Sequence, residues 1–247
     1  MDYKGSVSIP GASELVEDWA VYSNGTIMKK GAVVMRGTTL GTNLNFAILG
    51  TGALADVIGV LYEEQAAVTA GDDSNAAGTN FTKRKVIVDP FSFYRAEFDQ
   101  ADTMAVASVT STTQFTVTSG ETNMQGGWLY CVAGTGIGEL HLITTDDGSG
   151  LYTIKEAGTI AATDTLIKIV PKWHQLIKTS SDATMIGTDA AAGSGKVTVK
   201  DIWIKSDSIP LARLDPTKHS GLTGLNSDNV KFYADVIFRD HVYNTLD

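Results

Sequence analysis

Short runs of β-forming residues, separated by glycine-rich turns, make up the hydrophobic pattern between residues 123 and 170. Strand-length runs are found at 128–133, 139–144, 151–155 and 165–170. Glycines punctuate them, beginning with Gly126-Gly127 and ending with Gly158. The pattern predicts an antiparallel β-meander, and with a Thr-rich hairpin expected at 104–118 it defines a predicted inserted domain over residues 101–172.

Strand patterns on both sides of this domain predict a second β unit. The segments 85–89 and 91–98 are expected to form a hairpin with its aromatic side chains in the core. The segment 196–206 alternates, with a change of phase near Asp201 that predicts a β-bulge, and a final strand is expected near 230–238.

A tight turn is expected earlier in the chain, at Asn24-Gly25. This dipeptide tolerates positive φ at both positions and predicts a hairpin that joins 19–23 to 26–35. We assign this hairpin and the flanking strands to one β-barrel or sandwich-like domain, built from residues 21–100 and 196–247. The fold class predicted for the whole chain is therefore mainly β.

Residues 1–20 are predicted to form an extended N-terminal arm, in which Ser13 caps a brief helix that ends at Trp19. Apolar side chains on an otherwise unstructured segment need a partner to bury them, so the candidate contact residues are Tyr3, Ile9, Leu15 and Trp19. A frayed terminus is the alternative interpretation. Residues 173–195, which are rich in small side chains, predict a linker or long loop.

Length and charge narrow the classes of protein that fit. A chain of 247 residues is long enough for one large or two small domains, each with its own core. The net charge of −9 argues against a nucleic-acid surface, because the only basic run is Lys83-Arg84-Lys85. The first residues lack the pattern of a signal peptide, and no apolar run has membrane-spanning length. We expect a soluble protein that does not contact a membrane.

One motif invites an enzymatic interpretation. Residues 50–55 read G-T-G-A-L-A, which matches G-x-G-x-x-A, and a dinucleotide would bind at the start of a following helix. Gly59 and its β-branched neighbours favour a strand over that helix. The expected ribose-binding acid, Asp72 or Asp73, lies in a polar loop, and the chain lacks the alternating helices of a parallel sheet. Dinucleotide binding is therefore disfavoured.

Residues that often carry catalysis or bind metals are scattered along the chain. Cys131 is expected in the core, because no histidine near it in sequence would activate it as a nucleophile. Asp146-Asp147-Gly148 lacks the other ligands of a calcium loop and favours a hairpin turn. The histidines show no metal-ligand spacing: His141, His174, His219 and His241. We predict no enzyme activity, no catalytic residue, no cofactor and no metal.

Several segments resemble one family of phage proteins. KKGAVVMRGTTLGTN (29–43), GALADVIGVLYEEQAAV (52–68) and DPFSFYRAEFDQ (89–100) resemble the head decoration proteins of tailed bacteriophages, also called capsid cement or auxiliary capsid proteins. The elements G-G-W-L-Y and G-x-G-x-G-E-L within 126–140 are similar to modules of phage virion proteins. The last segment, FYADVIFRDHVYNTLD (232–247), resembles the terminal strand and tail of the same group.

The resemblance implies a virion structural protein, made in the host cytoplasm, that binds the capsid exterior as a homotrimer and cements the lattice of the major capsid protein. Tyr3, Ile9, Leu15 and Trp19 would then be capsid-contact residues. The 101–172 insertion departs from the small members of the group and leaves the trimer geometry open. A tail, fibre or carbohydrate-binding β module is the alternative, which Trp128, Trp173 and Trp203 grouped on one face would favour.

Overall fold

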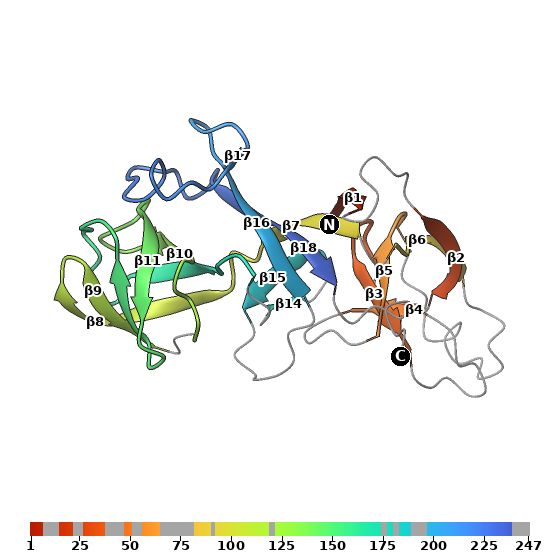
Figure 1. Cartoon of the computed structure of the whole chain (residues 1–247), viewed down its shortest axis with the longest axis horizontal. Helices are drawn as coiled ribbons and strands as arrows, with labels where there is room; N and C mark the ends of the chain where they lie inside the picture. The colour runs from red at the N-terminus through yellow and green to blue at the C-terminus, as the bar shows by residue number, and fades with distance from the viewer. Residues whose placement is uncertain are drawn as a thin grey trace.

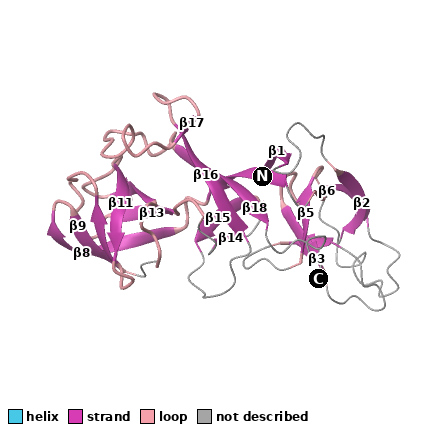
Figure 2. Ribbon diagram, in the orientation of Figure 1, coloured by secondary structure: helices cyan, strands magenta, loops and turns pink. Residues whose placement is uncertain are grey.

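The computed structural model describes residues 1–6, 15–21, 27–37, 47–50, 56–64, 82–89, 92–118, 122–173, 177–179, 183–188 and 197–238, and all structural statements below refer to them. Their regular structure is β throughout, which confirms the mainly β fold class (Figure 2). The strands are β1 (Asp2–Ser6), β2 (Val16–Val21), β3 (Val33–Arg36), β4 (Ala47–Leu49), β5 (Val57–Leu61), β6 (Thr82–Ile87), β7 (Ser92–Phe98), β8 (Thr103–Ser111), β9 (Gln114–Val117), β10 (Trp128–Ala133), β11 (Leu140–Asp146), β12 (Leu151–Ile154), β13 (Thr165–Ile169), β14 (Ile177–Thr179), β15 (Met185–Thr188), β16 (Val197–Lys205), β17 (Ala212–Arg213) and β18 (Lys231–Phe238).

The first unit is a closed five-stranded barrel with the strand order β2-β4-β3-β5-β6. Strand β5 is buried along its whole length, which explains why its sequence, VIGVL, is apolar at every position rather than alternating. Ile58 and Leu61 point into a core that also contains Val21, Met28, Val34, Ala47, Val86 and Val88. At Gly59 the backbone of β5 passes close to the carbonyl of Ile87.

The second unit is a closed six-stranded barrel with the order β10-β11-β12-β9-β8-β13 and antiparallel pairing throughout. The Thr-rich hairpin β8–β9 and the strands from 128 to 169 form as the sequence predicts. They do not make a simple meander, because β9 pairs with β12 and β13 returns to close on both β10 and β8. Because β13 pairs with β10, the sheet closes on itself and each of the six strands has a neighbour on both sides.

A central sheet lies between the barrels, with the order β14-β15-β7-β18-β16-β17 and with β1 also paired to β7. Alternating residues of β7 and β18 face inward, among them Tyr94, Phe98 and Phe232. The ladder between β16 and β18 shifts between Val199 and Asp201, which confirms the predicted bulge. Because β7 follows β6 and precedes β8 in the chain, it connects the two barrels.

The three units lie in a row and share buried contacts (Figure 1). Buried apolar residues of all three belong to one connected set, which includes Val57, Tyr94 and Trp128. The segment 206–230, between β16 and β18, reaches across to the six-stranded barrel. There Leu222 forms a β-bridge with Leu140, and the Tyr130 hydroxyl donates to the Leu225 carbonyl at 3.1 Å. This segment fastens the barrel to the central sheet.

Two predicted hairpins are wrong, because strands that follow each other in the chain pair elsewhere. The hairpin predicted at Asn24-Gly25 would pair β2 with β3. Instead, β2 pairs with β6 and β4, and β3 pairs with β4 and β5. Strands β6 and β7 belong to different sheets. Asn24-Gly25 itself lies outside the described residues. A turn signal fixes the local reversal of the chain, whereas barrel closure selects the neighbour of each strand.

The predicted arm, helix and linker also differ from the structure. Residues 16–21 form β2 rather than a helix, and 2–6 form β1, paired with β7. Within 173–195, β14 and β15 extend the central sheet, with β15 parallel to β7. Short strands of low hydrophobicity carry little local signal, and their backbone pairing to an existing sheet decides their structure. The predicted 21–100 plus 196–247 unit corresponds to a barrel and a separate sheet.

Candidate functional site

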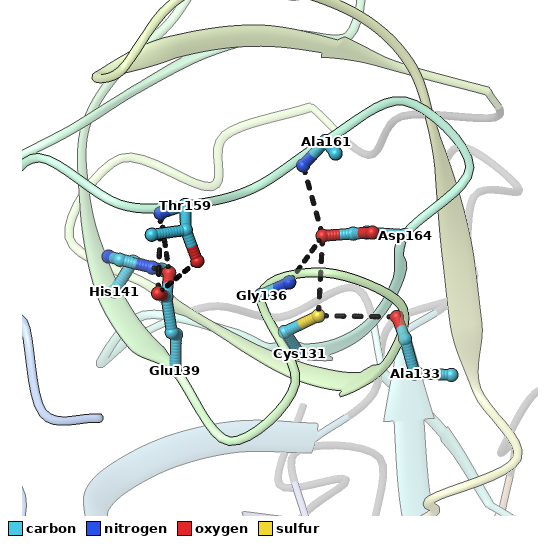
Figure 3. A network of polar contacts seen from close by, with 8 residues as sticks. All are labelled: Cys131, Ala133, Gly136, Glu139, His141, Thr159, Ala161 and Asp164. Atoms are coloured by element: carbon cyan, nitrogen blue, oxygen red, sulfur yellow. Dashed lines mark hydrogen bonds and ion pairs between the residues drawn. The ribbon is translucent and has the colours of Figure 1, made fainter. Parts of the chain in front are cut away.

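A buried carboxylate organises one end of the six-stranded barrel (Figure 3). Asp164, which directly precedes β13, is only 1% exposed. Its Oδ1 accepts the backbone N–H of Thr135 at 2.8 Å, and its Oδ2 accepts those of Gly136 at 2.9 Å and Ala161 at 3.0 Å. Hydrogen bonds from several backbone donors compensate for burying this charge. The carboxylate therefore ties the 134–138 loop to the turn before β13.

A second buried acid, Glu139, is held beside His141 (Figure 3). Its Oε1 accepts the Thr159 hydroxyl at 2.6 Å, and its Oε2 lies 2.9 Å from His141 Nε2. Burial acts to raise the pKa of Glu139, but the hydrogen bonds from Thr159 and His141 outweigh it and lower that pKa below its ordinary value. His141 Nδ1 is buried and has no hydrogen-bond partner among the described residues.

Cys131 lies in the same network but is not poised for nucleophilic chemistry. Burial, and after it the charge of Asp164, raises the pKa of the thiol to about 12. Its Sγ contacts the Ala133 carbonyl at 3.3 Å and Asp164 Oδ2 at 3.8 Å, rather than the imidazole of His141. The prediction that Cys131 is a core residue is confirmed. We conclude that this network holds loops in place.

Acid is expected to destabilise the six-stranded barrel through Glu139. Because folding lowers its pKa, the carboxylate contributes stability that is complete above its unfolded pKa and is lost as the pH falls through its folded pKa. At neutral pH we expect the native protein to exceed Glu139→Gln in stability by about 1–2 kcal/mol. Thermal unfolding of both proteins down to about pH 3 measures the difference, which should shrink in acid. A difference that stays constant over this range contradicts the assignment.

The outward face of the central sheet carries a connected arrangement of aromatic and charged side chains. Arg95 on β7 forms a bidentate ion pair with Asp235 on β18, with Nε–Oδ1 at 2.7 Å and Nη2–Oδ2 at 2.8 Å. The indole Nε1 of Trp203 on β16 donates to Asp235 Oδ2 at 2.9 Å. The Arg95 guanidinium carbon lies 4.1 Å from the centre of the Trp203 ring. We call the outward side chains of β7, β18, β16 and β17 the Trp203 face.

Side chains at the β17 edge complete the Trp203 face. Arg213 Nη2 lies 2.9 Å from Asp201 Oδ2, and its guanidinium carbon lies 5.5 Å from the centre of the Trp203 ring. Lys172 forms an ion pair with Asp201, the residue that follows the bulge. The next residue, Trp173, is 62% exposed, and Lys200 Nζ lies 4.7 Å from the centre of its ring. Trp, Tyr and Arg are the residues that most often dominate protein–protein binding.

The predicted contact residues that the structure describes lie in two different units. Tyr3 lies in β1 of the central sheet, in register with Tyr94, and Ile9 lies outside the described residues. Leu15 is 51% exposed at the start of β2, while Trp19 is half-buried against the core of the five-stranded barrel. Because Tyr3 and Trp19 belong to paired strands, the premise of an unstructured arm is wrong for them. Their contact with a capsid stays a prediction.

The disfavoured chemical motifs occupy ordinary structural places. Gly50 directly follows β4, residues 51–55 lie outside the described part, and β5 stands where a dinucleotide fold needs a helix. Asp146-Asp147-Gly148 forms the predicted turn between β11 and β12, in which Asp147 accepts the backbone N–H of Ser149 at 2.8 Å. Within the described ranges, no group of three or more His, Cys, Asp or Glu side chains is arranged to hold a metal ion.

The Trp203 face was not predicted from the sequence. Alternation of β7, β16 and β18 indicates which residues face outward, but not that residues 95, 203, 213 and 235 meet, because that depends on strand order and register. Of the tryptophans named as a possible group, Trp128 is buried in the six-stranded barrel, whereas Trp173 and Trp203 both lie at β16. The sequence feature that pointed to this part of the sheet was the predicted bulge near Asp201, a residue that pairs with Lys172 and Arg213.

Comparisons with known proteins do not identify the chain, since no protein-family model, no curated protein and no solved structure matches it. In the part of the chain that the structure describes, no helix is long and apolar enough to cross a membrane.

Proposed function

We propose that this protein is a virion structural protein that binds the outer surface of a phage capsid, as a homotrimer, and stabilises the lattice of the major capsid protein. The observation that carries the proposal is the Trp203 face, where side chains typical of binding hot spots are held by the partly buried Arg95–Asp235 ion pair. The resemblance of residues 29–43, 52–68 and 89–100 to head decoration proteins supplies the partner.

The proposed mechanism is binding without turnover. Side chains that are already ordered lose little conformational freedom on association, so a preformed face binds more tightly than a flexible one of equal area. The strands and the 206–230 segment join the three units through shared buried contacts, which lets a force on one unit pass to the next. Many copies on a shell then add their contributions, because release of one capsomer requires several interfaces to break.

Co-sedimentation with capsids tests the proposal. The purified protein is expected to be a trimer by size-exclusion chromatography with light scattering. It should pellet with expanded, empty capsids of the parent phage at a fixed, saturable ratio, and it should raise the temperature at which they disrupt. Unexpanded procapsids from the same preparation serve as the control surface. A protein that stays in the supernatant at all capsid concentrations overturns the proposal.

A second candidate is a tail, fibre or carbohydrate-binding module, which the exposed ring of Trp173 favours. Sugars stack on open aromatic faces, however, and here the Lys200 ammonium lies over one face of the Trp173 ring, while Arg95 and Arg213 lie over Trp203. A glycan array distinguishes the candidates. Binding to one glycan class that Trp173→Ala abolishes would favour the carbohydrate module over the capsid proposal.

A further inference from the structure

The Trp203 face carries an excess of positive charge on an acidic protein. In β7, β16, β17, β18 and residues 171–173, the cationic side chains number six and the carboxylates three. The cations are Arg95, Lys172, Lys200, Lys205, Arg213 and Lys231, and the acids are Glu97, Asp201 and Asp235. The whole chain, in contrast, has a net charge of −9. The sign of the charge on this face is therefore opposite to that of the chain.

The three carboxylates are already occupied by neighbours on the Trp203 face. Asp235 pairs with Arg95, Asp201 with both Lys172 and Arg213, and Glu97 lies 3.0 Å from Lys231 Nζ. Lys200 and Lys205 have no acidic partner within the described part of the chain. Lys205 also stands directly opposite Lys231 in the β16–β18 ladder, and Glu97 balances the charge of Lys231 but not that of Lys205.

A hollow adjoins the Trp203 face at Arg213. It has a volume of about 460 Å³ and is lined by residues 212–216 together with Lys218 and His219. Its single carboxylate, Asp215, accepts both the backbone N–H and the hydroxyl of Thr217 on Oδ1, and these hydrogen bonds lower its pKa. Arg213 belongs both to this hollow and to the Trp203 face. The hollow offers space for side chains that protrude from a partner.

We propose that the Trp203 face and the adjoining hollow dock on a protein surface rich in Asp and Glu, with Lys200, Lys205 and Arg213 contacting its carboxylates. This inference rests on the proposed function, because it states which part of the chain would meet the capsid and what chemistry the capsid would present. Complementary charge favours fast, oriented association, and it makes binding depend on ionic strength.

Charge density argues for an acidic protein over a nucleic acid as the partner. Double-stranded DNA presents one negative charge per about 1.7 Å of its axis, so a protein with strong overall negative charge meets broad repulsion outside its contact patch. Carboxylates on a folded protein surface are sparser and stand among polar and apolar groups. The aromatic rings and short-range ion pairs of the Trp203 face suit that mixed surface.

Reversing Lys200 and Lys205 tests the inference without breaking an ion pair between described residues. The variant Lys200→Glu/Lys205→Glu is compared with Lys30→Glu/Lys85→Glu, which changes the charge equally at exposed positions of the five-stranded barrel. Binding to expanded capsids is measured by co-sedimentation from about 50 to about 500 mM NaCl. We expect the first variant to bind about tenfold more weakly at low salt and to lose most of the salt dependence, and the control to stay within about twofold of the native protein.

Each outcome of this experiment decides between the two proposals. If both double variants bind capsids equally weakly, or if both bind as well as the native protein, the acidic-partner inference is overturned. The proposed function still stands in either case, provided that the native protein binds. Failure of the native protein to bind capsids overturns both. Melting temperatures of all three proteins should agree, and Lys200→Gln/Lys205→Gln, which removes charge without reversing it, should bind with intermediate strength. If a DNA duplex retains the native protein but not the Lys200→Glu/Lys205→Glu variant, the choice of an acidic protein as the partner is overturned.

Discussion

Replacement of Asp164 by asparagine is expected to lower the free energy of unfolding by about 3 kcal/mol or more. The asparagine has the same shape and keeps one acceptor oxygen, but its amide –NH2 cannot accept a hydrogen bond. Either the N–H of Thr135, which now points at Oδ1, or the N–H groups of Gly136 and Ala161, which point at Oδ2, therefore lose their acceptor. The loop that carries these donors has little room to adjust, because a Cβ at Gly134 would lie 2.0 Å from Asp164 Oδ1. Urea unfolding followed by near-ultraviolet circular dichroism measures the loss.

The matched control for Asp164 is Asp147→Asn. Asp147 also accepts backbone N–H groups, from Ser149 and Leu151, but it is exposed in the turn between β11 and β12. Water can replace the lost acceptor there, so we expect a loss below about 1 kcal/mol. If Asp164→Asn is no more destabilising than Asp147→Asn, the buried carboxylate does not organise the end of the barrel.

Replacement of Gly59 by alanine is expected to destabilise the five-stranded barrel by about 3 kcal/mol or more. Gly59 has a φ of +156°, and a Cβ there would lie 1.8 Å from the carbonyl oxygen of Ile87. That oxygen belongs to the backbone of β6, which is paired with β5, so relief of the clash requires separation of two barrel strands. Thermal unfolding measures the effect, and hydrogen exchange of the Val60 and Leu61 amides locates it.

Gly148→Ala separates backbone conformation from steric clash. Gly148 also has a positive φ, of +77°, but nothing lies within 4 Å of a Cβ placed there. Its substitution should therefore cost only the strain of the left-handed conformation, about 1–2 kcal/mol. Equal losses for Gly59→Ala and Gly148→Ala would show that the close approach to Ile87 is unimportant.

The Trp203 face was only partly accessible to sequence reasoning. Trp173 and Trp203 were named as possible surface residues together with Trp128, which is buried, and the bulge beside Asp201 was predicted. Arg95 and Asp235 are 140 positions apart, and nothing in the spacing of charged residues indicates that they pair. The pairing of β7 with β18 brings them opposite each other. The buried Asp164 and Glu139 were missed for the same reason, since their donors come from separate loops.

The sequence by itself determined the β class, most strand positions from 82 to 238, the β11–β12 turn, the β8–β9 hairpin and the core place of Cys131. These features depend on local alternation, turn residues and burial preference, which act over a few residues. Only the tertiary structure decided the barrel closures, the strand order of the central sheet and the residues that form the Trp203 face. Hydrogen bonds between backbones are nearly independent of sequence, so the choice of strand neighbours rests on packing of the whole core rather than on any one segment.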